Sequence, residues 1–190
     1  MNADAASSAD AVRRAAAVVQ QGGVIAYPTE AVYGLGCDPR NEAAVLRLLE
    51  IKQRDVSQGL ILIGQSLDDF HAYIRPLQDE VRERLLASWP GPVTWLVAVS
   101  NDCPRWLCGR HETVAIRATA HQQTRALCAA AGMPLVSTSA NRSGQKPAVS
   151  AAEVQQQLGD DIDYVLGGAT DGLARPCQIR DSESEKIIRR

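Results

Sequence analysis

The chain has 190 residues, of which 45% are hydrophobic and 22% are charged, and its formal net charge is −2. These values are ordinary for one globular domain with a sizeable core, and this charge does not call for a nucleic-acid partner. No stretch approaches the roughly 18 unbroken apolar residues of a membrane span. The N-terminus lacks the basic and apolar regions of a signal peptide, so we expect a cytoplasmic protein with no membrane association.

The cysteines and the basic residues narrow these expectations. Five cysteines form no CxxC motif, which fits a reducing compartment better than a disulfide framework. Arginine supplies 17 of the 20 basic residues, and only three are lysines. A lysine within a motif therefore calls for an explanation of why it is not arginine, such as the fit of a compact charge to a phosphate or a carboxylate.

The start of the chain predicts a helix, a strand and a binding loop. Apolar residues at helical spacing over 9–21 predict a helix that ends at Gly22. A short strand follows at 24–27. The stretch Pro28–Gly36 then combines a proline, which should stop sheet pairing, with hydroxyl and glycine residues. We interpret this stretch as a loop that forms one wall of a ligand pocket.

The next helix should begin after Asn41 and place Lys52 inward, because Lys52 lies seven residues after the apolar Val45. Further helices are predicted at 66–73, 78–88 and 121–131 and after Ser150. Further strands are predicted at 59–63, 93–99, 113–117, 134–136, 164–166 and 178–180. The segment 100–112 has an irregular pattern, and 181–190 is expected to be a mobile tail or a sheet edge.

This alternation predicts an α/β fold, a single domain over 1–190 with a mixed sheet flanked by helices. Ligands of such sheets bind at strand ends, where four clusters fall: Thr29, Lys52 with Arg54, Arg117, and Ser137–Asn141. Cations converging with hydroxyl and amide groups describe an anion pocket. Taken singly, each cluster has a plainer interpretation as solvated charges at a helix end, a surface arginine or a turn.

Other kinds of chemistry have weaker support. The sequence has neither of the glycine-rich motifs that cradle nucleotide phosphates, so a nucleotide would bind by another arrangement. It also has no Gly-x-Ser-x-Gly turn, which disfavours nucleophilic hydrolysis. Cys103, Cys108 and His111 offer three zinc ligands, but their spacing fits no strong zinc pattern.

Five motifs of this chain resemble, in content and order, those of the YrdC-like family, and the chain length matches its short, single-domain bacterial members. They are Pro28–Gly36, Lys52-Gln53-Arg54, Trp89–Thr94, Val114–Arg117 and Ser137–Asn141. The resemblance implies a twisted mixed sheet flanked by helices around a concave, positively charged cleft.

The resemblance also implies an enzyme, a nucleotidyltransferase that forms threonylcarbamoyl-AMP and pyrophosphate from L-threonine, bicarbonate or CO2, and ATP. The product would serve threonylcarbamoyladenosine formation in tRNA. Implied partners are a downstream tRNA threonylcarbamoyl transferase complex and tRNA itself. Mg²⁺ would travel with ATP, and no prosthetic group or protein metal site is expected. The alternative is a non-catalytic module that binds tRNA or double-stranded RNA, which the arginines permit but the net charge disfavours.

The resemblance assigns roles residue by residue. Threonine or its carbamate should contact Thr29, Arg117, Ser137 and Cys177. ATP should contact Lys52, Arg54, Thr94, Ser139 and Asn141, with Lys52 and Arg54 as the catalytic residues.

Two positions depart from the family pattern. Asp55 follows Arg54 where the family often has proline, so Asp55 either turns outward or weakens ATP binding. Cys177 stands where a serine is common, and a thiol is the poorer hydrogen-bond partner.

Overall fold

The computed structural model describes residues 3–174 and 177–189. Within these ranges, nine strands form one mixed sheet in the order β7-β1-β2-β6-β3-β5-β4-β8-β9. The strands are β1 (Ile25–Pro28), β2 (Tyr33–Gly36), β3 (Ile61–Gly64), β4 (Val93–Ala98), β5 (Thr113–Ala118), β6 (Leu135–Ser139), β7 (Tyr164–Val165), β8 (Gln178–Asp181) and β9 (Ile187–Arg189). The helices are α1 (Ala3–Gln20), α2 (Glu42–Lys52), α3 (Asp79–Ser88), α4 (Arg105–Cys108), α5 (Gln122–Ala131) and α6 (Ala151–Leu158), with 3-10 turns η1 (Val56–Gln58) and η2 (Leu67–Phe70).

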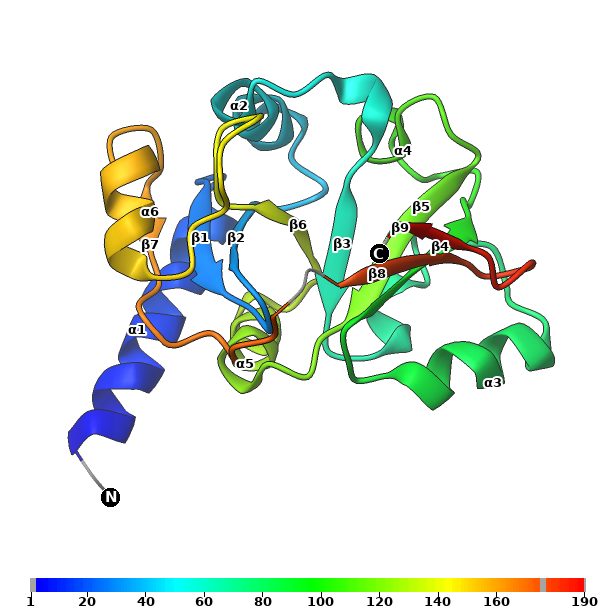
Figure 1. Cartoon of the computed structure of the whole chain (residues 1–190), viewed down its shortest axis with the longest axis horizontal. Coiled ribbons are helices and arrows are strands. Elements are labelled where there is room, and N and C mark those ends of the chain that lie inside the picture. The colour runs from blue at the N-terminus through cyan, green and yellow to red at the C-terminus, as the bar shows by residue number, and fades with distance from the viewer. Residues whose placement is uncertain (1–2, 175–176, 190) are drawn as a thin grey trace.

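Helices cover both faces of this sheet. Ile25 and Tyr27 pack with apolar residues of α1 and α5, whereas Val24 and Ala26 pack with α2 and α6 in the larger core cluster. Successive strand residues point to opposite faces, so β1 is buried on both sides. In Figure 1, α1 and α6 lie beside β7 and β1 at one end of the sheet, and β8 and β9 lie at the other. The expected α/β domain with a mixed sheet is confirmed.

The predicted start and inward face of α2 are also confirmed. Asn41 Oδ1 accepts a hydrogen bond from the backbone N–H of Ala44 at 3.1 Å. The helix is capped at its C-terminus by Gln53, which has a left-handed backbone with φ of 52°. Lys52, in the last turn, is buried.

The stretch after the first strand is a hairpin rather than one open loop. Pro28 pairs with Tyr33 at the end of β1, and residues 33–36 form β2, so the prediction of a loop over this whole stretch was wrong. A Cβ at Gly36 would lie 2.2 Å from the carbonyl oxygen of Val136. The absence of a side chain at Gly36 therefore allows β2 to pack close to β6. Only residues 29–32 remain as a loop.

Three further expectations needed correction. The helix predicted at 66–73 is only the short turn η2, because Ile74 forms a bridge with Val99 at the end of β4. The segment 100–112 contains α4, and Ser137–Ser139 extend β6 instead of forming a loop. The C-terminal tail is an edge, since β9 pairs with β8. No helix in the described ranges has the length and apolarity that crossing a membrane requires.

Candidate active site

A cavity of about 520 Å³ lies over the middle of the sheet. Its walls come from the hairpin loop, from η1 and from strands that include β4, β5, β6, β8 and β9. Arg54, Arg117 and Arg189 line it, and the described lining contains no aspartate or glutamate. Several threonine and serine hydroxyl groups lie between these cations. This chemistry suits anionic ligands.

Seven of the nine predicted site residues line this cavity. They are Thr29, Arg54, Thr94, Arg117, Ser137, Ser139 and Cys177. The elements that carry them are far apart in the sequence but adjacent in the sheet, where β2 pairs with β6 and β4 pairs with β8. Lys52 and Asn141 are the two that do not line the cavity.

Lys52 and Asn141 meet behind the cavity wall. The ammonium of Lys52 donates to the backbone oxygens of Ser139 at 2.6 Å and Asn141 at 2.7 Å, and to Asn141 Oδ1 at 2.8 Å. Three N–H groups are all that an ammonium has. Burial, with a smaller contribution from Arg54, lowers the pKa of Lys52 to about 8. Lys52 therefore fixes the turn after β6, and its donors are occupied by the protein.

The Arg54 side chain, in contrast, reaches the cavity with unused donors. Its Nη2 donates to the carbonyl oxygen of Gly59 at 2.9 Å, while its Nε is buried and has no partner among the described residues. Thr94 Oγ1 is also buried and has no hydrogen-bond partner among the described residues. Buried polar atoms without partners are rare, and both belong to residues of the cavity wall. This wall of the cavity therefore holds polar groups that the described residues leave unsatisfied.

Arg117 is held by a residue that the sequence did not indicate. Its Nη1 donates to the carboxylate of Glu30, and both side chains are almost fully buried. The second carboxylate oxygen of Glu30 accepts from Thr119 Oγ1 at 2.7 Å and from the backbone N–H of Ala120 at 3.0 Å. Glu30 does not line the cavity. Its neighbour Thr29 does, and the hydroxyl of Thr29 donates to the backbone oxygen of Val32 at 2.6 Å.

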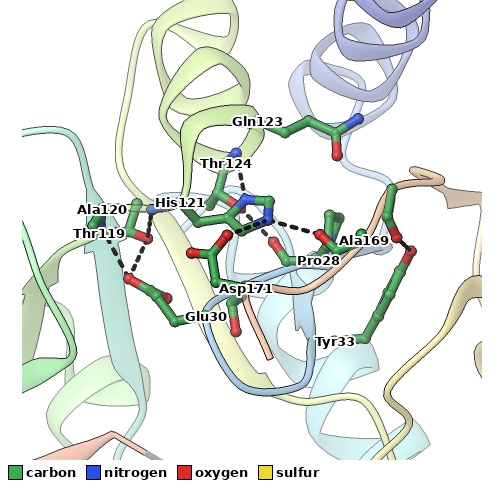
Figure 2. A network of polar contacts seen from close by, with 12 residues as sticks. Pro28, Glu30, Tyr33, Thr119, Ala120, His121, Gln123, Thr124, Ala169 and Asp171 are labelled. Carbon is green, nitrogen blue, oxygen red and sulfur yellow. Dashed lines mark hydrogen bonds and ion pairs between the residues drawn. The ribbon is translucent and has the colours of Figure 1, made fainter. Parts of the chain in front are cut away.

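A polar network secures the outer side of the hairpin loop (Figure 2). His121 Nδ1 accepts a hydrogen bond from the backbone N–H of Thr124 at 3.3 Å. The proton of the neutral ring is therefore on Nε2, which donates to the backbone oxygen of Ala169 at 3.0 Å. Thr124 Oγ1 donates to the backbone oxygen of Pro28, and the hydroxyl of Tyr33 donates to the backbone oxygen of Gly168. The segment after β7 is thereby tied to the loop that carries Thr29.

The two departures from the family pattern have different outcomes. Asp55 is exposed and does not line the cavity, and its carboxylate accepts from the backbone N–H of Ser57 at 2.7 Å. Cys177 is half-buried and lines the cavity. Burial raises the pKa of its thiol, although the nearby Arg117 opposes this rise. Cys177 is therefore a neutral thiol at pH 7.

The sequence pattern missed Arg189 because it lies in a tail of alternating charges. It lines the cavity from β9, and its charge adds to burial in lowering the pKa of Arg54. The pairing of β9 with β8, which brings Arg189 there, has no short-range signal. The zinc interpretation gains no support, since the described residues contain no group of three or more His, Cys, Asp or Glu side chains suited to a metal ion.

Comparison with known proteins gives consistent matches. The family model Sua5_yciO_yrdC, described as telomere recombination, matches residues 17–190. A protein of Xanthomonas euvesicatoria pv. vesicatoria named threonylcarbamoyl-AMP synthase is 54% identical over 93% of this chain and 95% of its own length. One of the same name from Nitrosococcus oceani is 47% identical over 94% of this chain and 96% of its own length.

Solved structures show the same architecture. The structure of P. abyssi Sua5 complexed with L-threonine has a TM-score of 0.85 at 30% identity, covering 90% of this chain and 50% of that one. The crystal structure of E. coli YciO has a TM-score of 0.82 at 27% identity, covering 95% of this chain and 89% of that one.

Proposed function

Because this chain belongs to the Sua5/YciO/YrdC family, we propose that it makes threonylcarbamoyl-AMP and pyrophosphate from ATP, L-threonine and bicarbonate or CO2. The observation that carries the proposal is the arginine-lined cavity, whose described lining contains no carboxylate and includes two residues with buried, unpartnered polar atoms. Such a cavity suits two anionic reactants, a nucleotide and an amino acid carbamate.

In this proposal, the threonine end of the cavity would be formed by four of its lining residues, Thr29, Arg117, Ser137 and Cys177. The guanidinium of Arg117 would receive the carboxylate of threonine, because its planar fork matches a carboxylate with two parallel hydrogen bonds. The threonine complex of the P. abyssi relative supports a threonine site in this fold.

The ATP end would be formed by the lining residues Arg54, Thr94 and Ser139, and we add Arg189 to it. Arg54 and Arg189 would neutralise phosphate charge. Lys52 and Asn141 would act on this end through the backbone of the turn that carries Ser139. Magnesium would arrive on the phosphate oxygens of ATP, which are ligands that it prefers, and would neutralise phosphate charge there.

The reaction follows from holding these reactants together. The threonine amine attacks CO2 and loses a proton to give a carbamate. A carbamate oxygen then forms a bond to the α-phosphorus of ATP, and the bond to the bridging oxygen breaks as pyrophosphate leaves with its electron pair. No protein nucleophile is needed. The contribution of the site is orientation and neutralisation of charge around the phosphorus.

The proposal extends to the use of the product. The adenylate would pass in the cytoplasm to a tRNA threonylcarbamoyl transferase complex, for which tRNA is the final acceptor. Five free cysteines fit such a reducing compartment.

Pyrophosphate release tests the proposed activity. Release should require ATP, L-threonine and bicarbonate together, and turnover without threonine would overturn the proposal. Binding of tRNA or double-stranded RNA that ignores ATP and threonine, with no turnover, would favour the non-catalytic RNA-binding module instead.

A further inference from the structure

Glu30 lies beside the cavity without lining it, and the reaction above gives it no role. We propose that Glu30 is a positioning residue that fixes the guanidinium of Arg117, so that the free edge of this group receives the carboxylate of threonine. The inference rests on the proposed function, because that function places this carboxylate at Arg117.

The carboxylate of Glu30 is itself rigidly held. One oxygen accepts from Arg117 Nη1, and the other accepts from Thr119 Oγ1 at 2.7 Å and from the backbone N–H of Ala120 at 3.0 Å. Figure 2 shows the two contacts of the second oxygen. Only 2% of Glu30 is exposed, so water does not compete for these donors. A carboxylate anchored at both oxygens fixes the position of the group it binds.

Arg117 depends on this anchor. It lies near the end of β5, is 5% exposed, and its side chain has no hydrogen-bond partner other than Glu30 among the described residues. A guanidinium has five N–H donors, so most of them are left for a ligand in the cavity that Arg117 lines. Without Glu30 the side chain would gain rotamer freedom, and its buried charge would lack a counter-ion.

The charge state of Glu30 is consistent with this role. Burial alone would raise the pKa of the carboxyl, but the charge and hydrogen bond of Arg117 and the hydrogen bond of Thr119 lower it overall. Glu30 is therefore an anion at neutral pH. It balances Arg117 while the cavity is empty and remains bound to a different nitrogen when a ligand carboxylate arrives.

A purely structural role is the competing explanation, since Glu30 also belongs to the loop that carries Thr29. Its backbone oxygen accepts from the N–H of Leu173 at 3.0 Å. A control must therefore loosen the same loop without touching Arg117. Thr124→Val does this, because Thr124 is fully buried and its hydroxyl donates to the backbone oxygen of Pro28.

The test measures binding of L-threonine and of L-threoninol, which has an alcohol in place of the carboxylate, by calorimetry. We expect Glu30→Gln to weaken L-threonine binding at least about tenfold, the scale of a charge-assisted hydrogen bond. L-threoninol should bind wild type and Glu30→Gln equally. Any loss in Thr124→Val, which loosens the loop that carries Thr29, should be the same for both ligands. If Glu30→Gln fails to fold, Glu30→Asp, which keeps the charge but withdraws it, should give the same pattern.

The contradicting results are distinct. Equal losses for both ligands, or wild-type threonine binding in Glu30→Gln, would overturn the role of Glu30 and leave the proposed function standing. A wild-type protein that binds no threonine would overturn both.

Discussion

The ammonium of Lys52 lies 2.7 Å from the backbone oxygen of Asn141 and 2.8 Å from its side-chain oxygen. This relationship assigns Lys52 a different part from Arg54, although the two residues are only two positions apart. Lys52 shapes the turn after β6, while Arg54 lines the cavity and its side chain donates only to Gly59 among the described residues. The two cations should therefore fail in different ways when they are replaced.

Replacement of Lys52 should lower the rate of pyrophosphate release. In Lys52→Met the oxygens of Ser139 and Asn141 lose their shared donor, and the turn should move. A displacement of about 1 Å can cost roughly 100-fold, so we expect kcat for pyrophosphate release to fall by about that factor. Lys52→Arg should not restore it, because a planar guanidinium does not fit the site of a compact ammonium. Lys146→Met, an exposed lysine of the same region, should retain activity; a normal kcat in Lys52→Met would contradict the assignment.

Replacement of Arg54 should weaken the binding of ATP. Hydrogen bonds to charged groups contribute about 1.5–3 kcal/mol, so Arg54→Ala should raise KM for ATP roughly 10- to 100-fold. KM for threonine should change little, because the proposed function assigns the threonine carboxylate to Arg117 and not to Arg54. Steady-state kinetics with each substrate varied in turn measure both values, with the exposed Arg110→Ala as the charge-matched control. An equal rise in both KM values would argue against separate ends.

Replacement of Cys177 by serine should not weaken the binding of threonine. The thiol is neutral and is a weak hydrogen-bond partner, whereas a hydroxyl group of similar size is a better one. Cys177→Ser should therefore leave KM for threonine unchanged or lower it. A large increase in KM would mean that the sulfur atom is adapted to this cavity.

Local patterns predicted the elements of the fold well where periodicity was strong. The helix after Asn41 and the inward direction of Lys52 followed from apolar spacing alone. β2 was missed because two of its four residues are glycines, which local propensity disfavours in a strand. The close approach of β2 to β6 depends on contact with Val136, which is far from β2 in the sequence.

The candidate site was predicted as a set of residue types, and less well as a geometry. Seven of nine residues reached the cavity, because hydroxyl groups and arginines at strand ends converge in a mixed sheet. Glu30 was missed since its partner Arg117 is 87 positions away. Arg189 was missed because β9 joins the sheet only through β8.

The Glu30–Arg117 pair also predicts a pH dependence of stability. The folded-state pKa of Glu30 is lowered, so its contribution is present above the unfolded pKa of about 4.3 and is lost as pH falls through the folded value. Glu30→Gln should lower the free energy of unfolding at pH 7 by about 3 kcal/mol, as expected when a buried ion loses its partner. The difference from wild type should shrink below about pH 4. Urea unfolding at several pH values measures it, and a constant difference would contradict the pairing.

The most direct test of the proposed reaction is to supply ¹³C-bicarbonate with ATP and L-threonine and to identify the nucleotide product by mass spectrometry. Threonylcarbamoyl-AMP should appear and carry the ¹³C label, since the carbamoyl carbon comes from bicarbonate. A threonine adduct of AMP without the label would show direct activation of the amino acid carboxylate and would contradict the proposed function.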